Sequence, residues 1–528
     1  MPTDSDRYIL AIDLGTSGPK VALASVRGEI VAWDFEATAL ILLPNGGAEQ
    51  SPDDWWNAIK KATARLLEKR LIPIEHIVAV SCTAQWSGTV AVDRAGRHLM
   101  NAVIWLDARG APYAQRVTDG LIKIEGYGLW KLLKWIRLAG GAPGRTGKDS
   151  IAHILYIKHD LPAICQQTYK FLEPKDYLNL RLTGRFAASF DSIALHWVTD
   201  NRNIPNVMYD EGLLRMSTLD RDKLPDLKRA TDILGTIKPE VADELGLPRT
   251  AQVVTGTPDV QSAAIGSGAV RDYEAHLYIG TSAWLACHVP FKKTDVFHNI
   301  ASLPSAIPGR YIVSNEQQTA GACLAFLKRN VLSHNNGPST GAGAPDVYEF
   351  LDQIADRTPA GSGKVIFTPW LQGERTPVGD HLVRSGMYNL SLQTTRDQII
   401  RAVFEGVAYN AKWLLGYVEK FVGRRFSGVN MVGGGAKSNV WCQIHADVFD
   451  RPIRQVKDPI LVNVRGAAFL ASVALGYLAF DEVSECVPIA QTYEPNPQNR
   501  KVYDELFQEF VNLYKSNKSI YTRLNRMA

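Results

Sequence analysis

The sequence predicts an α/β protein with at least two domains that arose by duplication of one unit. The chain has 528 residues, more than the roughly 250 to 300 at which a single hydrophobic core stops growing. Short apolar strand patterns alternate with helix patterns along it, and one order of elements occurs twice. With 46% hydrophobic and 21% charged residues, the composition is that of a globular protein.

The first unit opens with three strand patterns. Residues 8–14 (YILAIDL), 20–26 (KVALASV) and 29–37 (EIVAWDFEA) are apolar or alternating runs separated by turn sequences, which predicts an antiparallel meander. A helix should follow Ser51, because a cap residue, a proline and two acids stand in succession there. Residues 77–84 (IVAVSCTA) then predict a buried strand, and residues 88–105 a hairpin that turns at 93–96.

The second unit repeats this order. Residues 275–289 (AHLYIGTSAWLACHV) read as strand, turn and strand, residues 309–317 as a third strand and residues 321–332 as a helix. The two Gly-Thr-Ser turns, which begin at Gly15 and Gly280, lie about half of the chain apart, so an internal duplication is the simplest explanation. We therefore expect an N-terminal domain of residues 1–257 and a C-terminal domain of residues 258–528.

Further patterns complete this outline. Surface loops are expected at 333–345 and 358–364, which are rich in Gly, Ser and Pro, and helices at 394–421 and 501–517. The weakly polar run at 466–480 is shorter than the roughly 18 residues of a membrane span, so it predicts a buried, Ala-rich helix.

Charge and cysteine content exclude several classes of partner. The net charge is only +4 and no long Lys/Arg block occurs, so no nucleic acid is expected; no signal or spanning segment indicates a membrane. The six cysteines are far apart and form no CxxC pair, which favours the reduced cytoplasm. The oligomeric state, including a homodimer, stays open.

The turn after the first strand has the chemistry of a phosphate loop. Gly15 and Gly18 allow a tight turn, Thr16 and Ser17 add hydroxyl donors, and a lysine follows at position 20. A carboxylate at position 13 would repel phosphate unless a divalent cation lay between them, so we expect Asp13 on the metal side of the site. The alternative is an Asx-type turn in an ordinary hairpin.

Two further glycine turns could contact the same nucleotide. The second copy of the loop, at Gly280 and Thr281, has no following lysine, and alone it would be read as a hairpin turn. The third is the run 433–435, which leads from a strand into a helix capped by Ser438; such helix N-termini bind the adenine, ribose or α-phosphate of a nucleotide. A close strand-to-helix turn is the alternative.

Asp259 is the candidate catalytic base. It follows Pro258 at the start of an apolar helix, where a plain helix cap is the alternative. Its position between the two units places it at the junction of the domains, and phosphoryl transfer to an alcohol needs a carboxylate that orients the hydroxyl and accepts its proton. In contrast, GAPGRTGKDS (141–150) is rejected as a P-loop, because Ala142 replaces the first glycine and Asp149 the hydroxyl residue.

These motifs belong to a longer set that is found, in order, in one known family. The set is DLGTSGPK, WLDARG, PKDYLNLRLTG, GTPDVQSAAIGSG, YIGTSAW, GMYNLSLQTTRDQIIRAVFEG and GGGAKSNVWCQIHADVFDRPI. It resembles the FGGY carbohydrate kinases over nearly the whole chain. The resemblance implies two ribonuclease-H-like domains of the actin/sugar-kinase superfamily, with ATP, Mg²⁺ and a small sugar or polyol in the cleft between them.

The resemblance also assigns roles to residues. It implies that Asp13 is the Mg²⁺-associated acid and Asp259 the catalytic base. The residues that it places on the nucleotide are Gly15, Thr16, Ser17, Lys20, Gly280, Thr281, Gly434, Gly435, Ala436 and Asn439. Asn389 replaces a family glycine at a turn, and Asn tolerates the positive φ that this turn requires.

The acceptor positions depart from the family. In TAQWSG, which includes Gln85, Trp86 and Ser87 occupy positions where xylulokinases usually have methionine and histidine, and Val260 stands where they have asparagine. We expect Trp86 to cover the apolar face of the acceptor, and Asp107 with Arg109 to bind hydroxyls.

Taken together, the sequence predicts an ATP- and Mg²⁺-dependent kinase for a primary hydroxyl of a ketose, with D-xylulose as the first acceptor. Ribulose, glycerol, a tetritol or gluconate are alternatives. The competing class is a non-catalytic, actin-like nucleotide switch, which would not need Asp259 beside Trp86 and Asp107.

Overall fold

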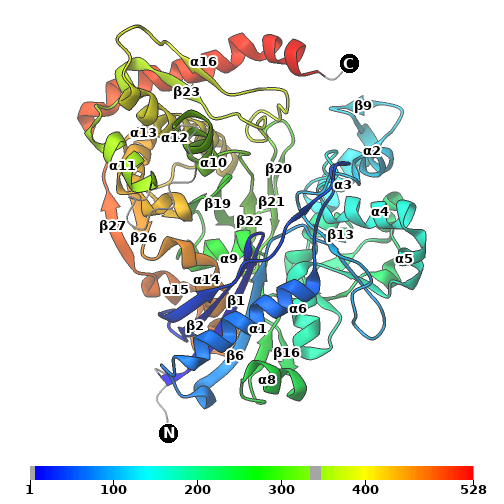
Figure 1. Ribbon diagram of the computed structural model, residues 1–528. Coiled ribbons are helices and arrows are strands. Elements are labelled where there is room, and N and C mark those ends of the chain that lie inside the picture. The colour runs from blue at the N-terminus through cyan, green and yellow to red at the C-terminus, as the bar shows by residue number, and fades with distance from the viewer. Residues whose placement is uncertain (1–5, 333–346, 527–528) are drawn as a thin grey trace.

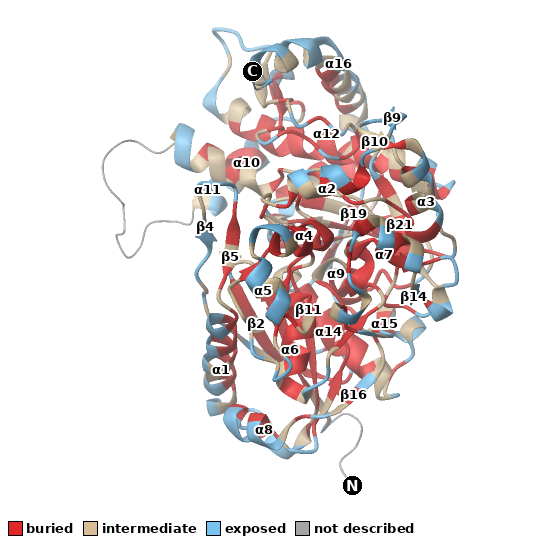
Figure 2. Ribbon diagram, turned by 90° about the vertical axis from the view of Figure 1, so that its right-hand side faces the viewer, coloured by how far each residue is buried: buried red, intermediate tan, exposed pale blue. Residues whose placement is uncertain are grey.

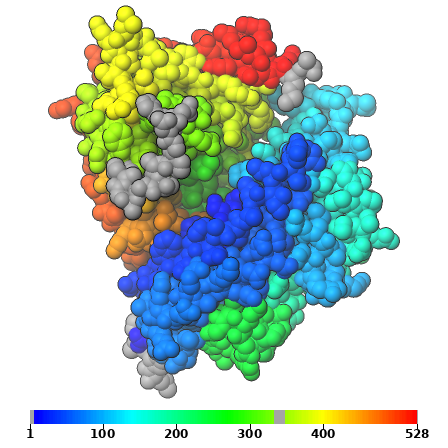
Figure 3. Space-filling model, viewed as in Figure 1, coloured from blue at the N-terminus to red at the C-terminus, as the bar shows by residue number. Residues whose placement is uncertain are grey.

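A computed structural model of the chain describes residues 6–332 and 347–526. The predicted loop at 333–345 therefore lies outside the described residues, whereas the one at 358–364 is a loop that ends in a single 3₁₀ turn, Ser362–Lys364. Two large β-sheets lie in different parts of the molecule, one formed by the first half of the chain and one by the second (Figure 1). In the space-filling view the blue and cyan first half and the yellow to red second half occupy separate regions (Figure 3).

Six strands form the first sheet: β1 (Tyr8–Gly15), β2 (Gly18–Ser25), β3 (Ile30–Phe35), β6 (Ile77–Ala84), β16 (Ile233–Thr236) and β17 (Gln252–Val254). Their order is β16-β17-β6-β1-β2-β3. The first three pair antiparallel, as predicted, whereas β6 runs parallel to β1 and β17 parallel to β6. β16 is antiparallel at the edge.

Eight strands form the second sheet: β18 (Ala275–Ile279), β19 (Ala283–Val289), β20 (Thr294–Asp295), β21 (Ile300–Pro304), β22 (Tyr311–Ser314), β25 (Val429–Val432), β26 (Ile453–Val456) and β27 (Ile489–Tyr493). Within it, β22-β19-β18-β25-β26 repeats the order and directions of β3-β2-β1-β6-β17, and β27 is the antiparallel edge strand. The repeated topology confirms the internal duplication. β20 and β21, which extend the far edge, are additions that the sequence patterns did not predict.

Helices cover both sheets. In the first half they are α1 (Pro52–Glu68), α2 (Ala111–Thr118), α3 (Leu129–Ala139), α4 (Ser150–Asp160), α5 (Pro162–Gln167), α6 (Pro174–Thr183), α7 (Glu211–Ser217) and α8 (Pro239–Leu245). α1 begins as predicted, because the Ser51 side chain accepts a hydrogen bond from the Asp54 amide. Its buried face carries Trp55, Ile59 and Leu66 at helical spacing, so it packs this stripe into the core of the first sheet.

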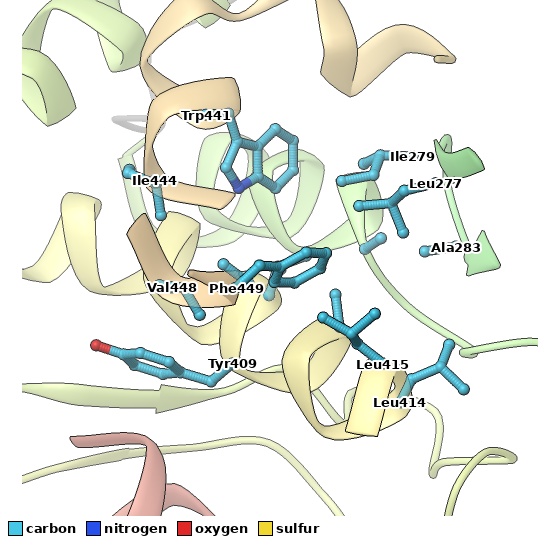
Figure 4. Close-up of a cluster of buried hydrophobic side chains, with 14 of the residues drawn as sticks. Leu277, Ile279, Ala283, Tyr409, Leu414, Leu415, Trp441, Ile444, Val448 and Phe449 are labelled. Atoms are coloured by element: carbon cyan, nitrogen blue, oxygen red, sulfur yellow. The ribbon is translucent and has the colours of Figure 1, made fainter. Parts of the chain in front are cut away.

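In the second half, the hydrophobic core lies between the sheet and the helices that cover it. Its helices are α10 (Gly321–Phe326), α11 (Val347–Arg357), α12 (Arg396–Val422), α13 (Asn439–Phe449), α15 (Phe480–Cys486) and α16 (Arg500–Asn525). A capping box between Thr395 and Gln398 starts α12. Figure 4 shows leucines of α12 and aromatic rings of α13 gathered beside Leu277, Ile279 and Ala283 of β18 and β19.

Two helices cross at the centre of the molecule, between the sheets (Figure 1): α9 (Asp259–Gly266) and α14 (Val462–Ala474). A Cβ atom on Gly266 would lie 1.9 Å from the carbonyl oxygen of Val462, and one on Gly466 would lie 1.9 Å from the carbonyl oxygen of Ser262. These reciprocal contacts make the crossing symmetric. Both helices are largely buried (Figure 2), and α14 also packs against the first sheet through small residues such as Ala467 and Ala468.

Two expectations about elements were only partly right. The predicted Ala-rich helix starts earlier, at Val462, and stops at Ala474, because Gly476 has φ 80°. The predicted hairpin at 88–105 turns at 93–96, but it is held by isolated bridges. Its two arms, β7 (Val90–Val92) and β8 (Ala102–Val103), are buried and pair instead with β11 (Lys170–Leu172) and β5 (Ala48–Gln50).

All six cysteines are free. None of the helices in residues 6–332 and 347–526 combines the length and apolar character that a membrane crossing needs. Asn389 adopts φ 63°, which confirms the expected turn.

Candidate active site

The first predicted phosphate loop is the hairpin between β1 and β2. Gly15 and Gly18 form its last strand pair, so Thr16 and Ser17 make a two-residue turn. Within the described residues, nothing accepts a hydrogen bond from the backbone N–H groups of these two residues, which leaves two donors at the tip. Gly18 is required by its φ of 138° and by packing, since a Cβ there would lie 2.0 Å from the Glu36 carbonyl oxygen.

The hydroxyl of Thr16 is engaged within the protein. It donates to Gln85 Oε1 over 3.1 Å and accepts from Trp105 Nε1 over 2.9 Å. The Gln85 side chain donates in turn to Gln50 Oε1 over 2.7 Å, and Gln50 returns a hydrogen bond to the Thr16 carbonyl over 2.8 Å. Thr16 and Gln85, predicted as nucleotide and acceptor contacts, are therefore brought together as one network. Ser17 is exposed, and its hydroxyl makes no hydrogen bond within the described residues.

Asp13 lies two residues before this turn and is 2% exposed. Its Oδ2 atom is 3.3 Å from the Lys20 ammonium, the cross-strand partner of Asp13, and 3.4 Å from the Asn463 amide nitrogen of α14. The other oxygen, Oδ1, is buried and has no hydrogen-bond partner among the described residues, and the same is true of Asn463 Oδ1. Two buried oxygen acceptors without donors suit a hydrated cation.

Asp259 is the first residue of α9, directly after Pro258. Its carboxylate accepts a hydrogen bond from the amide of the next residue, Val260, over 2.8 Å. A helix cap would instead accept from an amide two or three residues further on. Burial raises the pKa of Asp259 to about 7, and the negative charge of Asp13 adds to the rise; hydrogen bonds from the backbone of Val260 and Trp86 oppose it. The structure therefore brings both predicted carboxylates, and Trp86, to one junction between the halves.

The acceptor residues follow the end of β6. Trp86 donates from Nε1 to the Ser192 carbonyl over 2.9 Å, and Ser87 donates from Oγ to the Lys148 carbonyl over 2.7 Å. Ser87 has φ 65°, a left-handed conformation that redirects the chain just after the strand. These side chains are thus fixed by the inserted segment between β6 and β17.

Asp107 is fully buried and saturated by internal partners. Its oxygens accept from the backbone amides of Ala48 and Arg109 and from the Arg109 guanidinium. Arg109 also pairs with Glu49 over 2.7 Å and donates to the Tyr156 hydroxyl over 2.8 Å. The expected acceptor contact of Asp107 is therefore not apparent in the geometry, where this residue holds Arg109 in place.

The second loop sits at the equivalent turn of the second sheet. Gly280, Thr281 and Ser282 connect β18 to β19, and the carbonyls of Gly280 and Thr281 accept amide hydrogen bonds from residues 320–322 at the start of α10. Within the described chain the Thr281 amide has no acceptor, so this loop offers a donor like that of the first.

The third glycine run follows β25, the symmetry mate of β6. Gly433 has φ 86°, and a Cβ there would lie 2.6 Å from the Ile279 carbonyl oxygen, so the run packs directly on the end of β18. Residues Gly434–Lys437 form a 3₁₀ turn, and Ser438 caps α13 by accepting from the Trp441 amide over 3.1 Å. Gly434 and Asn439 are exposed at the helix N-terminus, whereas Ala436 is buried.

Sequence reasoning missed several neighbours of the two carboxylates. Alignment of the Gly-Thr-Ser turns places Tyr278 where the first copy has Asp13, and the pKa of Tyr278 is raised by burial and by the charges of Asp13 and Asp259. Glu316, which follows β22, raises the pKa of Asp259. The duplication was the signal that could have found Tyr278, whereas Asn463 and Glu316 approach only through tertiary packing.

No cluster of three or more His, Cys, Asp or Glu side chains suited to a metal ion occurs in the described parts of the chain. Mg²⁺ needs no such cluster, since one or two carboxylates, phosphate oxygens and water usually hold it. Asp13 with its free oxygen fits that donor set.

Comparison with known proteins agrees with this geometry. Residues 8–266 match the N-terminal domain, and residues 276–475 the C-terminal domain, of the FGGY family of carbohydrate kinases. Relatives include the xylulose kinase of Escherichia coli (strain K12), 29% identical over 96% of this chain and 98% of its own. The xylulose kinase of Bacillus subtilis (strain 168) is 27% identical over 98% and 99%. The gluconokinase of the same strain is 25% identical over 98% and 97%.

Solved structures share the fold. The gluconate kinase of Lactobacillus acidophilus superposes with a TM-score of 0.84, 23% identity and coverage of 98% of this chain and 99% of its own. The ligand-bound xylulose kinase of the same organism gives 0.84 at 23% identity, with 98% and 100% covered. Together with the match to both family domains, these superpositions confirm the predicted two-domain α/β fold.

Proposed function

Because the chain belongs to the FGGY family of carbohydrate kinases, we propose that it transfers the γ-phosphate of ATP to a primary hydroxyl of a ketose, with D-xylulose as the first acceptor. Membership makes the protein a phosphotransferase with an alcohol group as acceptor. Several full-length relatives are xylulose kinases, which supports D-xylulose, and the gluconokinase relatives keep gluconate as an alternative.

The observation that carries this proposal is the environment of Asp259. A carboxylate with a pKa of about 7 is poised to accept a proton at neutral pH, and burial beside Asp13 supplies that value. A nucleotide switch without an acceptor would have no use for a base at this position.

The reaction then follows from the positions of the side chains. Asp259 orients the primary hydroxyl of the acceptor and takes its proton as the hydroxyl oxygen bonds to the γ-phosphorus. The bond from the γ-phosphorus to the β,γ-bridging oxygen breaks, and ADP leaves with that oxygen. Positioning and charge stabilisation supply most of the rate in phosphoryl transfer, so the surrounding donors matter as much as the base.

The two symmetric hairpins supply those donors. We propose that the free amides of Thr16, Ser17 and Thr281, the glycine backbones beside them and the Lys20 ammonium contact the β- and γ-phosphates. The adenosine lies, in this proposal, at the N-terminus of α13. There the residues Gly434, Gly435, Ala436 and Asn439 present backbone and amide groups.

Mg²⁺ fits the oxygen atoms that remain free. Asp13 would hold the ion, and Asn463 would face its hydration shell, because both have a buried oxygen without a partner. The ion supplies neutralisation of phosphate charge when it is bound. Before the ion binds, the Lys20 ammonium neutralises the negative charge of the Asp13 carboxylate.

The acceptor would lie against Trp86 and Ser87, next to Asp259. The Trp86 ring is anchored at Nε1 and can cover an apolar sugar face. We propose that Gln85 and Asp107 act by holding the Thr16 turn and Arg109, respectively, since their polar atoms are engaged internally.

Residues 1–257 and 258–528 are proposed as the two domains that close on the ligands. The proposed compartment is the cytoplasm, where the free cysteines stay reduced.

The deciding experiment uses Asp259→Asn, with Asp119→Asn, an exposed acid outside the junction, as the control. Acceptor-dependent ADP release is measured with pentuloses, hexuloses, glycerol, tetritols and gluconate. We expect turnover with D-xylulose, a fall in kcat of about a hundred- to ten-thousandfold in Asp259→Asn, and retained ATP binding by calorimetry. Unchanged turnover in this variant would refute the base, and wild-type protein inactive toward every acceptor would favour the nucleotide switch.

A further inference from the structure

The rejected P-loop look-alike at 141–150 places a lysine beside the acceptor residues. Ser87 Oγ donates to the backbone carbonyl of Lys148 over 2.7 Å, so this loop is bonded directly to the end of β6. The next residue in the loop, Asp149, accepts from the Trp197 indole and from the Gly144 amide, both over 2.7 Å. The loop is therefore held on both sides of Lys148.

The ammonium of Lys148 has no counter-ion within the described residues. The residue is half-buried, and among the described residues its side chain makes no hydrogen bond and no ion pair. The acids nearby are already engaged, Asp149 with the donors named above and Glu316 with Arg375 over 2.7 Å. A half-buried cation without a partner is unfavourable, unless a ligand supplies the missing acceptor.

Contacts along the chain link Lys148 to the reaction site. The backbone of Trp86 lies close enough to Asp259 to lower the pKa of that carboxyl, and the next residue, Ser87, donates from Oγ to the Lys148 carbonyl. Glu316, from the second half, lies within electrostatic range of both groups, since its charge raises the pKa of Asp259 and of Lys148; burial, the largest influence, lowers the pKa of Lys148, and Arg375 adds to this. Lys148 and Asp259 thus flank Trp86 and Ser87.

We propose that the Lys148 ammonium binds the acceptor at the end remote from its reacting hydroxyl and so determines acceptor specificity. This inference rests on the proposed function. Its partner is an electron-rich oxygen, which is the carbonyl of a ketose or the carboxylate of a sugar acid. The lysine then replaces the polar contacts that Trp86 and Ser87 do not provide.

The test is Lys148→Met, which keeps the length of the side chain and removes its charge. Lys158→Met is the matched control, because Lys158, in α4, is also half-buried but donates to the Thr218 carbonyl at the end of α7. Steady-state kinetics with D-xylulose and with D-gluconate should show an acceptor KM raised about ten- to hundredfold in Lys148→Met, with kcat and the KM for ATP within about threefold. Lys148→Arg should restore part of the affinity.

The two acceptors distinguish the sources of the oxygen. A rise in KM with D-xylulose identifies the carbonyl, and a rise with D-gluconate identifies the carboxylate. An unchanged acceptor KM, for every acceptor that the wild type phosphorylates, would overturn the inference and leave the proposed function intact. Wild-type protein without turnover on any acceptor would overturn both, and a loss of kcat alone would assign Lys148 a structural role and refute the inference.

Discussion

The amide nitrogen of Asn463 lies 3.4 Å from Oδ2 of Asp13, and this contact joins the second half of the chain to the proposed metal-side acid of the first. The two residues are 450 positions apart. The backbone carbonyl of Asn463 also accepts from Ser262 Oγ over 2.7 Å, so the same residue ties α14 to α9. Asn463 therefore connects Asp13 to the helix that begins with Asp259.

We expect Asn463→Ala to lower kcat about tenfold and to raise the Mg²⁺ concentration needed for half-maximal activity, because Asp13 loses its neutral donor. Asn463→Asp should instead lower this Mg²⁺ requirement, since a second carboxylate beside Asp13 attracts the cation more strongly. Titration of activity with Mg²⁺ at saturating ATP checks both variants. An identical Mg²⁺ requirement in all three proteins would contradict a role for Asn463 toward Asp13.

The pH profile should report Asp259. Its base form is ionised, so kcat/KM for the acceptor is expected to fall as pH drops through about 7. Glu316→Gln should move this limb to lower pH, because Glu316 helps to raise the pKa of Asp259. Burial also raises the pKa of Glu374 to about 7, so Glu374→Gln is the control and should keep the limb. If the limb shifts in Glu374→Gln instead, the titrating group is Glu374, and the assignment of the limb to Asp259 is wrong.

Asp259 should also cost stability, increasingly so as pH rises from about 4 to 7. Its folded pKa of about 7 exceeds the ordinary value of 3.8, so the folded state binds the proton more tightly, and the associated stability is lost as pH rises from about 4 to above 7. Asp259→Asn should therefore raise Tm, and more at pH 8 than at pH 5. Differential scanning fluorimetry at the two pH values measures this, and a smaller gain at pH 8 would be inconsistent with a raised pKa.

The helix crossing should tolerate no side chain. Gly466→Ala places a methyl group against the Ser262 carbonyl and is expected to destabilise the fold by about 1–3 kcal/mol or more. Gly416→Ala in α12 is the matched control, because nothing lies within 4 Å of a Cβ there, and it should stabilise the protein by about 0.5–1 kcal/mol. Denaturant unfolding compares the two. Equal effects would mean that helix propensity, not the crossing, governs Gly466.

Much of the fold could be predicted because its signals are local. The apolar runs around Asp13 and Tyr278, the cap at Ser51 and the capping box at Thr395 each depend on a few neighbouring residues. The arms of the expected hairpin at 88–105 found distant partners, because the pairing of short buried strands is decided by tertiary packing that a local pattern does not contain.

The site divides in the same way. Asp13 and Asp259 stand in motifs with a recognisable chemistry, so they could be named from the sequence. The internal engagement of Thr16 and Asp107 could not, since their partners, such as Trp105 and Arg109, are defined by how side chains turn once the chain is folded. In the sequence, Lys148 stood out only as part of the rejected P-loop motif, and its lack of a counter-ion among the described residues is a property of the folded molecule.

The crossing of α9 and α14 has a consequence for sequence variation. Gly266 and Gly466 each touch backbone atoms of the other helix, and a backbone carbonyl is the same whatever residue carries it. No substitution in one helix can therefore compensate for a larger residue in the other. Although these positions make the closest contacts between α9 and α14, we expect them to stay fixed rather than to covary, so that methods that infer contacts from correlated substitutions would miss this crossing.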